Sequence, residues 1–210
     1  MGAVNARFVS LATGYALGGG LLRRKGVKQR PWLTLHRLET EAVYLRHQVR
    51  ALQAAGGGTV RADIDMLDGD SYYDIIRARI HSPLLERVMD LLHPDGEHRL
   101  TPDAIQAAGV RGLASLWLDR GLWNGEAGEL PMRTLDDAEL IRSALHALGI
   151  LSAPPVGTYR ALRIGGAYMK DLSEILRPHV HRSMRHALRP GSQHGLTLIS
   201  TERHIKRLPL

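Results

Sequence analysis

Arginine is the residue type whose chemistry points most clearly to a function in this chain. Of its 28 basic residues, 24 are arginine and four are lysine, and the formal net charge is +7. The planar guanidinium group donates paired hydrogen bonds to phosphate and stacks on bases better than an ammonium group does. A positive excess of this size favours a polyanionic partner, with nucleic acid as the leading candidate. A GC-rich genome would produce the same arginine bias without any function, so the positions of these residues matter more than their number.

The basic residues gather toward both ends of the chain. Seven of them, but no acid, precede Glu39, and seven lie between Arg177 and the C-terminus with Glu202 as the one acid. The histidines of the C-terminal stretch have no regular ligand spacing and lie among arginines that repel a cation, so we expect neither a metal site nor a cofactor. No apolar run has the length of a membrane span.

Helical and strand periodicities alternate along the chain. They determine on which face of each helix or strand the basic side chains lie. Residues 5–17 are apolar nearly all round, which predicts a buried helix. Strand side chains alternate between the two faces of a sheet, so Arg77 and Arg79 share one face while Ile76 and Ala78 share the other. The predicted strands are 21–25, 32–36, 59–66, 72–80, 159–164 and 196–200, and the further helices are 39–54, 83–92 and 140–148.

A nine-residue pattern occurs twice, about a hundred residues apart. Residues 12–20 have the sequence ATGYALGGG, and residues 113–121 have the sequence LASLWLDRG. Each is an apolar helical stretch that contains small residues and ends in a glycine. Both resemble the signature helix of the LAGLIDADG homing endonucleases. The order of elements after each motif, and the basic segment 177–188 that is similar to the ending of the family, extend the resemblance over residues 6 to 188.

The resemblance implies an α+β fold of two αββαββα repeats in a pseudo-twofold saddle. The first repeat would span residues 1–94, a linker 95–100, the second repeat 101–188, and a basic C-terminal tail 189–210. The two motif helices would pack together on the axis of the molecule. Gly14 and Gly18 lie four residues apart on one helix face and would allow the partner helix, with its small residues Ala114 and Ser115, to approach closely.

The same resemblance leads us to predict that the chain is not an enzyme. In the family, the penultimate motif residue is a metal-binding aspartate, and the metal ion lowers the pKa of a bound water and clamps the reacting oxygens. Here that position is Gly19 in one copy and Arg120 in the other. Asp119 is adjacent, but one step along a helix rotates a side chain by about 100°. We therefore interpret the chain as a pseudoenzyme.

In this family the concave face of the sheets lies on nucleic acid. The residues that match this face include no acid, which favours nucleic-acid binding over a face that is merely solvated. Basic residues in the last element and the tail are expected to anchor to phosphate in a sequence-independent way. The predicted nucleic-acid-binding residues are Arg23, Arg24, Lys25, Lys28, Arg30, Trp32, Thr34, His36, Arg77, Arg79, Arg133, Arg160, Arg163, Arg182, Arg185, Arg189, Arg203, Lys206 and Arg207.

The resemblance implies the function of a structural RNA-binding protein, because members of the family that lose cleavage are retained in this role, and a subunit of the mitochondrial ribosome is one form of it. Its partner would be structured ribosomal or intron RNA together with neighbouring ribonucleoprotein subunits, and it would have no membrane partner. The acid-free, arginine-containing N-terminus resembles a mitochondrial transit peptide, but it is poor in serine and its cleavage would remove the first motif helix, so we interpret residues 5–17 as structure that overlaps an import signal. The expected location is the mitochondrion, and otherwise the chain is expected to be soluble and intracellular. Two alternatives remain open: a degenerate DNA-binding homing endonuclease or intron maturase, and a protein–protein scaffold.

Overall fold

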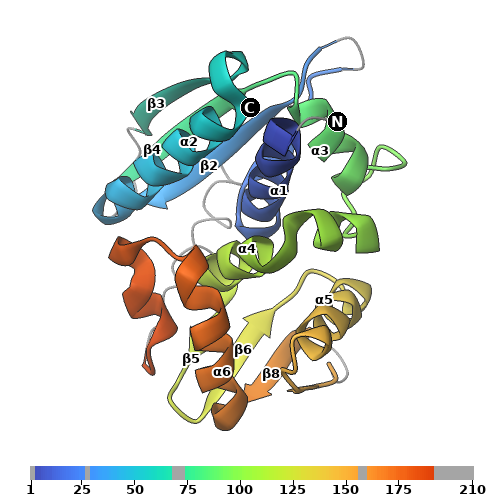
Figure 1. Cartoon of the computed structure of the whole chain (residues 1–210), viewed down its shortest axis with the longest axis vertical. Helices are drawn as coiled ribbons and strands as arrows, with labels where there is room; N and C mark the ends of the chain where they lie inside the picture. The colour runs from blue at the N-terminus through green and yellow to red at the C-terminus, as the bar shows by residue number, and fades with distance from the viewer. Residues whose placement is uncertain (1–2, 27–28, 68–73, 156–159, 192–210) are drawn as a thin grey trace. The chain divides into compact units, whose positions relative to one another are not determined.

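The computed structural model describes residues 3–26, 29–67, 74–155 and 160–191. The chain forms two compact units, Met1–Gly112 and Leu113–Leu210 (Figure 1). The boundary between them falls inside a long helix. The predicted repeat limits at residues 94 and 101 stay a prediction. Within the described residues, no helix is both long and apolar enough to cross a membrane.

The first unit contains a four-stranded antiparallel sheet in the order β1-β2-β4-β3. Helices α1 and α2 pack against each other, and both contact strand β2 (Figure 1). The elements are α1 (Ala3–Gly18), β1 (Leu21–Arg23), β2 (Trp32–Leu38), α2 (Ala42–Gly56), β3 (Arg61–Leu67), β4 (Ile75–His81) and α3 (Leu85–Leu92), with 3-10 turns at Glu39–Glu41 and Gly57–Thr59.

The second unit repeats this order of elements. Its sheet is also four-stranded and antiparallel, in the order β5-β6-β8-β7. The mixed helix and strand fold with two αββαββα repeats is thus confirmed. The elements are α4 (Pro102–Arg120), which begins in the first unit, β5 (Leu122–Trp123), β6 (Ala127–Pro131), α5 (Leu135–Ala147), β7 (Ser152–Ala153), β8 (Ala161–Gly165), α6 (Gly166–Leu176) and 3-10 segments at Arg177–His179 and Arg182–Leu188.

Burial of one face of the first sheet determines which residues point away from the helices. Leu33 and Leu35 of β2 and Ile76, Ala78 and Ile80 of β4 are almost fully buried, and they alternate with more exposed residues. Because strand side chains alternate in direction, the residues between them, Thr34 and His36 of β2 and Arg77 and Arg79 of β4, lie on the opposite, open face. The alternation predicted for β4 is confirmed.

Helix α4 bends at Gly109. This residue has φ 57°, a left-handed conformation that glycine adopts without steric cost. Before the bend, Thr101 Oγ1 accepts a hydrogen bond from the backbone N–H of Ala104 at 3.1 Å and caps the helix. The structure therefore contains a short helix that begins after Thr101 and is followed by the second motif helix.

Strands β5 and β6 were not predicted from the sequence. They are short, and a turn at Asn124 and Gly125 joins them. The side-chain oxygen of Asn124 accepts hydrogen bonds from the backbone N–H groups of Glu126 and Ala127, at 3.0 and 2.8 Å. Asn-Gly between apolar residues is a strong hairpin signal, and it was the available clue to this pair of strands.

The segment Arg182–Leu188 belongs to the folded core of the second unit. Met184, Ala187 and Leu188 are buried. The indole Nε1 of Trp117 donates to the backbone oxygen of Ala187 at 3.3 Å, and Ser173 Oγ donates to the backbone oxygen of Leu188 at 2.7 Å. The predicted strand 196–200 lies outside the described residues.

The first motif helix meets the start of α4 at two glycines of the first unit. A Cβ added at Gly14 would lie 2.9 Å from the Cα of Gly112, so the two backbones approach too closely for any side chain. One turn earlier, Ser10 Oγ donates to the backbone oxygen of Ala108 at 3.3 Å. Close approach at Gly14 was predicted, but the small residue that Gly14 faces is Gly112.

Replacing Gly14 by alanine is expected to lower Tm, although alanine favours a helix by about 1 kcal/mol over glycine. The added carbon meets the backbone of Gly112, and overpacking of this kind costs about 1–3 kcal/mol. Thermal unfolding followed by circular dichroism measures the effect. Gly58→Ala is the control, because nothing lies within 4 Å of its added carbon. An unchanged Tm for Gly14→Ala would contradict the close approach.

Candidate nucleic-acid interface

The open face of the first sheet brings together most of the residues predicted there. Arg23 and Arg79 are exposed, Arg77 and His36 are half-buried, and Thr34 is buried. The antiparallel pairing sets these side chains beside one another on adjacent strands. The pairs are Arg23 with Trp32 across β1 and β2, and Thr34 with Arg79 and His36 with Arg77 across β2 and β4.

Strand β3 adds two acids to this face. Asp65 pairs with Arg77 and Asp63 with Arg79 across β3 and β4. Arg77 Nε donates to Asp65 Oδ1 at 2.9 Å, and Arg77 Nη2 donates to Oδ2 of the same carboxylate. The face therefore carries cations and carboxylates together, and the expectation that it lacks acids is wrong. Alternation along residues 61–66 placed Asp63 and Asp65 on one face, but only the strand pairing sets them beside the arginines.

The hydrogen bond between Arg77 and Asp65 changes the titration of both groups. It lowers the pKa of Asp65 and raises the pKa of Arg77. Both side chains are partly exposed, so the pair contributes at most about 1 kcal/mol to stability. The two hydrogen bonds restrict the orientation of the Arg77 guanidinium group relative to Asp65.

His36 is neutral at physiological pH. Burial, followed by the positive charges of Arg77, Arg37 and Arg23, lowers its pKa from 6.5 to about 4. A neutral imidazole has one nitrogen that donates a hydrogen bond and one that accepts. The open face thus contains, beside Arg77, an uncharged ring that can both donate and accept a hydrogen bond.

The turn between β1 and β2 carries further cations. Lys25 and Arg30 are exposed, whereas Arg24 forms an ion pair with Glu86 of α3. Arg24 is therefore committed to a neighbouring helix in the free protein. The predicted residues Lys28, Arg203, Lys206 and Arg207 lie outside the described residues.

The second sheet presents fewer cations. Arg163 is exposed on β8, between the buried residues Leu162 and Ile164, and pairs with Glu129 of β6. Arg133 and Arg160 lie outside the strands, where Arg160 Nη1 donates to the backbone oxygen of Arg133 at 2.7 Å. Sequence reasoning missed Glu129 because β6 itself was not predicted. The C-terminal residues Arg182, Arg185 and Arg189 are exposed on or next to the last 3-10 segment.

Each motif ends in a glycine that the packing requires. A Cβ at Gly20 would lie 2.8 Å from the backbone oxygen of Tyr15, and one at Gly121 would lie 2.4 Å from the ring of Trp117. Asp119 is 2% exposed, and the neighbouring Arg120 is half-buried. Among the described residues, no three histidines, acids or cysteines are grouped so that they could hold a metal ion.

Comparison with known proteins gives matches in structure only. No family model and no curated protein sequence matches the chain. The homing endonuclease I-WcaI bound to its DNA recognition sequence is similar, with a TM-score of 0.66, 13% identity, and coverage of 88% of each chain. I-DmoI in complex with DNA and Mn is also similar, with a TM-score of 0.58, 16% identity, and coverage of 84% of this chain and 99% of the other.

The prediction that the chain is not an enzyme is wrong. It rested on positions 19 and 120 alone, whereas solved structures that share this fold include homing endonucleases, one of them in complex with DNA and Mn. Two positions of a motif do not define a whole site, because carboxylates are brought together by the tertiary structure, and Asp119 remains in the second motif helix.

The fold of these structures matches this chain over 88% and 85% of its length. The chain has the fold of the LAGLIDADG homing endonucleases.

Proposed function

We propose that this chain is a DNA-binding protein of the homing-endonuclease type, and that the open face of each sheet contacts a DNA duplex. The observation that carries the proposal is the position of Arg23, Arg79 and Arg163, which are exposed on strand faces opposite the buried ones. The similar structures I-WcaI and I-DmoI were determined with DNA, which supports the same partner.

The chemistry of the first sheet suits both parts of duplex recognition. The major groove of B-DNA admits a two-stranded β-ribbon, and arginine pairs with guanine O6 and N7 there. Arg23 and Arg79 are free of carboxylate contacts closer than 4.0 Å among the described residues, so they are available for phosphate or guanine. His36 and Thr34 can donate to or accept from base edges.

Arg77 would enter the complex differently from the two exposed arginines. Its bond to Asp65 fixes the direction of the guanidinium group before DNA arrives, which lowers the entropy lost on binding. Asp63 and Asp65 also repel phosphate, so the backbone of the duplex should lie over β1 and β2 and away from β3. Acids on the interface disfavour positions of the duplex that bring phosphate close to them.

A structural RNA-binding protein, including a mitochondrial ribosome subunit or an intron maturase, is the second candidate. The arginine-rich composition favours it, since guanidinium groups stack on unpaired bases in folded RNA. Competition at fixed salt between a selected DNA duplex and folded ribosomal or intron RNA separates the two. A duplex preference of about tenfold, or about 1.4 kcal/mol, supports DNA, and the reverse preference overturns it. A protein–protein scaffold would show only weak, non-saturating nucleic-acid binding, with a salt slope near zero.

The selected duplex also serves as a substrate. Incubation of the complex with Mg²⁺ or Mn²⁺ measures cleavage directly. If the duplex is cut, Asp119→Asn should abolish the cut while leaving DNA binding in place, because Asp119 is the carboxylate within the second motif. Asp136→Asn on α5 is the matched control, since it makes the same substitution at an exposed position outside the sheet of the same unit.

The double variant Arg23→Ala/Arg79→Ala is expected to bind DNA more weakly. Loss of two phosphate contacts should flatten the plot of log K against log salt by up to about two units. Fluorescence anisotropy with a labelled duplex across a salt series measures both quantities. Arg87→Ala is the control because Arg87 is exposed on α3, outside the sheet. Equal effects of the two changes would contradict an interface on the sheet.

DNA binding is expected to raise the pKa of His36 from about 4, because phosphate offsets the charges of Arg77 and Arg23. In the free protein the folded pKa lies below 6.5, so folding favours the neutral ring. That stability is fully present above pH 6.5 and is lost as the pH falls to about 4. NMR titration of the ring Cε1–H, with and without duplex, measures the shift, and His36→Asn identifies the signal. A pKa that does not change on binding would place the DNA elsewhere.

A further inference from the structure

A second set of cations lies on the helices of the first unit. Helices α1 and α2 contain no acid, and neither does the segment 104–112 of α4. Their exposed basic residues are Arg7 of α1, Arg46, His47 and Arg50 of α2, and Arg111 of α4. We call these five residues the helical basic surface. The residues predicted to bind nucleic acid from the sequence did not include any of them.

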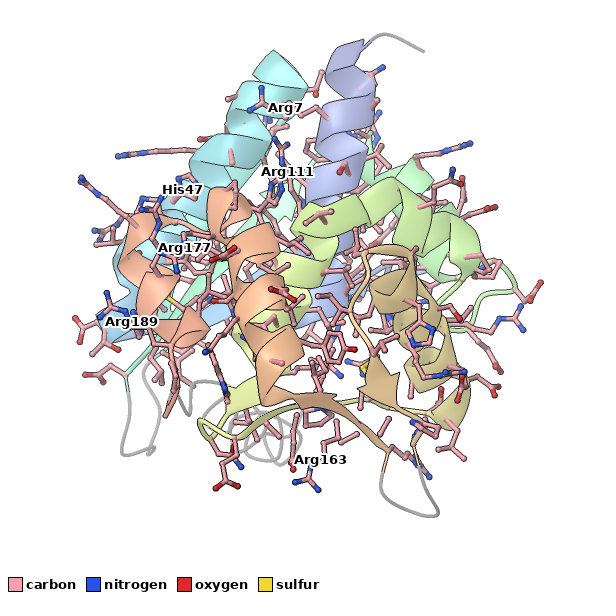
Figure 2. The ribbon with its side chains drawn as sticks, turned by 60° about the horizontal axis from the view of Figure 1, so that its bottom comes forward. Arg7, His47, Arg111, Arg163, Arg177 and Arg189 are labelled. Atoms are coloured by element: carbon pink, nitrogen blue, oxygen red, sulfur yellow. The ribbon has the colours of Figure 1, made fainter. Side chains whose placement is uncertain are left out.

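The three helices that carry this surface are in contact. A Cβ at Gly56 of α2 would lie 2.9 Å from Phe8 Cδ2 of α1, and Gly14 of α1 meets Gly112 of α4. Arg7 precedes Phe8 directly, and Arg111 precedes Gly112 directly, so both arginines lie next to a contact between helices. Figure 2 shows Arg7, His47 and Arg111 in one region of the view, beside α1, α2 and the start of the second half of α4.

The arginines of the helical basic surface are not neutralised within the unit. Arg7, Arg46, Arg50 and Arg111 form no ion pair with a described residue, whereas Arg24, Arg77 and Arg99 each do. On α3, carboxylates accompany the basic residue, since Glu86 and Asp90 lie there. Helices α1 and α2 and the segment 104–112 of α4 have no such carboxylates to offset the repulsion between their cations. A concentration of one sign of charge attracts a partner of the opposite sign.

The open face of the sheet and the helical basic surface lie on opposite sides of the first sheet, because α2 covers the face that includes Leu33 and Leu35. A duplex on the open face would have to bend sharply to follow the helices as well, and a duplex with a persistence length of about 150 base pairs resists such a bend. A single strand is flexible enough to follow a helical surface. Arginine and histidine present flat groups on which unpaired bases stack, and unpaired bases are the usual target of RNA recognition.

We propose that the helical basic surface binds single-stranded segments of RNA, independently of DNA binding by the sheet. Phosphate contacts from Arg46 and Arg50, one helical turn apart on α2, would follow the strand, and Arg7 and Arg111 would extend the track onto α1 and α4. The surface goes beyond the proposed DNA-binding function and does not depend on it.

Two double variants of the full chain test the surface: Arg46→Gln/Arg50→Gln and Arg7→Gln/Arg111→Gln. The probe is a fluorescein-labelled 20-nucleotide oligouridylate, and binding is followed by anisotropy across a salt series. Each variant removes two cations, so RNA affinity should fall about tenfold near physiological salt and the salt slope should flatten by about 1.4 units. Arg87→Gln/Arg99→Gln removes the same charge elsewhere in the unit and should leave both quantities close to those of the unaltered protein. Circular dichroism melting verifies that every variant is folded.

The sheet variant Arg23→Ala/Arg79→Ala separates this proposal from the proposed function. It should keep RNA affinity, and the two helical variants should keep duplex DNA affinity. RNA binding that is unchanged in both helical variants, or that falls equally in the control, overturns the proposal. So does tighter binding of a 20-nucleotide oligothymidylate or of polyglutamate than of the RNA, because the surface would then serve single-stranded DNA or an acidic protein.

Discussion

The open faces of this protein exist because their opposite faces are buried. In the first sheet, Leu33, Leu35, Ile76, Ala78 and Ile80 are removed from water by the helices, and each such side chain contributes about 1–3 kcal/mol when fully buried. The pleat of the strands then forces every alternate residue outward. A shift of one residue in a strand would exchange the two sets, so the same burial that stabilises the sheet also holds its arginines in place.

The strand pairing decides the electrostatics of that face. It sets Asp65 against Arg77 and leaves Arg23 and Arg79 exposed, so the three arginines differ although the sequence makes them look alike. It also places His36 between cations in a half-buried position, where protonation is disfavoured. A polyanion on this face would meet the free guanidinium groups of Arg23 and Arg79. It would also meet the guanidinium group of Arg77, which Asp65 already holds, and the neutral ring of His36.

The first unit presents cations on two sides, and their settings differ. On the sheet they alternate with carboxylates, an arrangement that favours one register of a partner over others. On the helices they are not accompanied by acids, an arrangement that favours attraction without strong selection. On the basis of these two settings we propose selective binding on the sheet side and general phosphate binding on the helix side.

The sequence by itself determined the local features of this protein. The two motif helices, the glycines that close them, the alternation along β4 and the basic segment at 177–188 follow from spacing and residue type, because helix and strand periods act over a few residues. The resemblance carried by these features was sufficient to predict the α+β fold with two repeats, and the similar solved structures agree.

Only the tertiary structure decided which residues meet. It joined Gly14 to Gly112 and Arg24 to Glu86, which are far apart in the sequence, and it set Arg77 against Asp65 on the neighbouring strand. It also buried Arg37, whose guanidinium carbon lies 5.3 Å from the centre of the Tyr44 ring, although its charge had counted with the exposed cations. Loss of activity could not be inferred from two motif positions for the same reason. A functional site requires defined distances between side chains from separate segments. Those distances depend on strand pairing and helix packing, and local sequence patterns do not specify them.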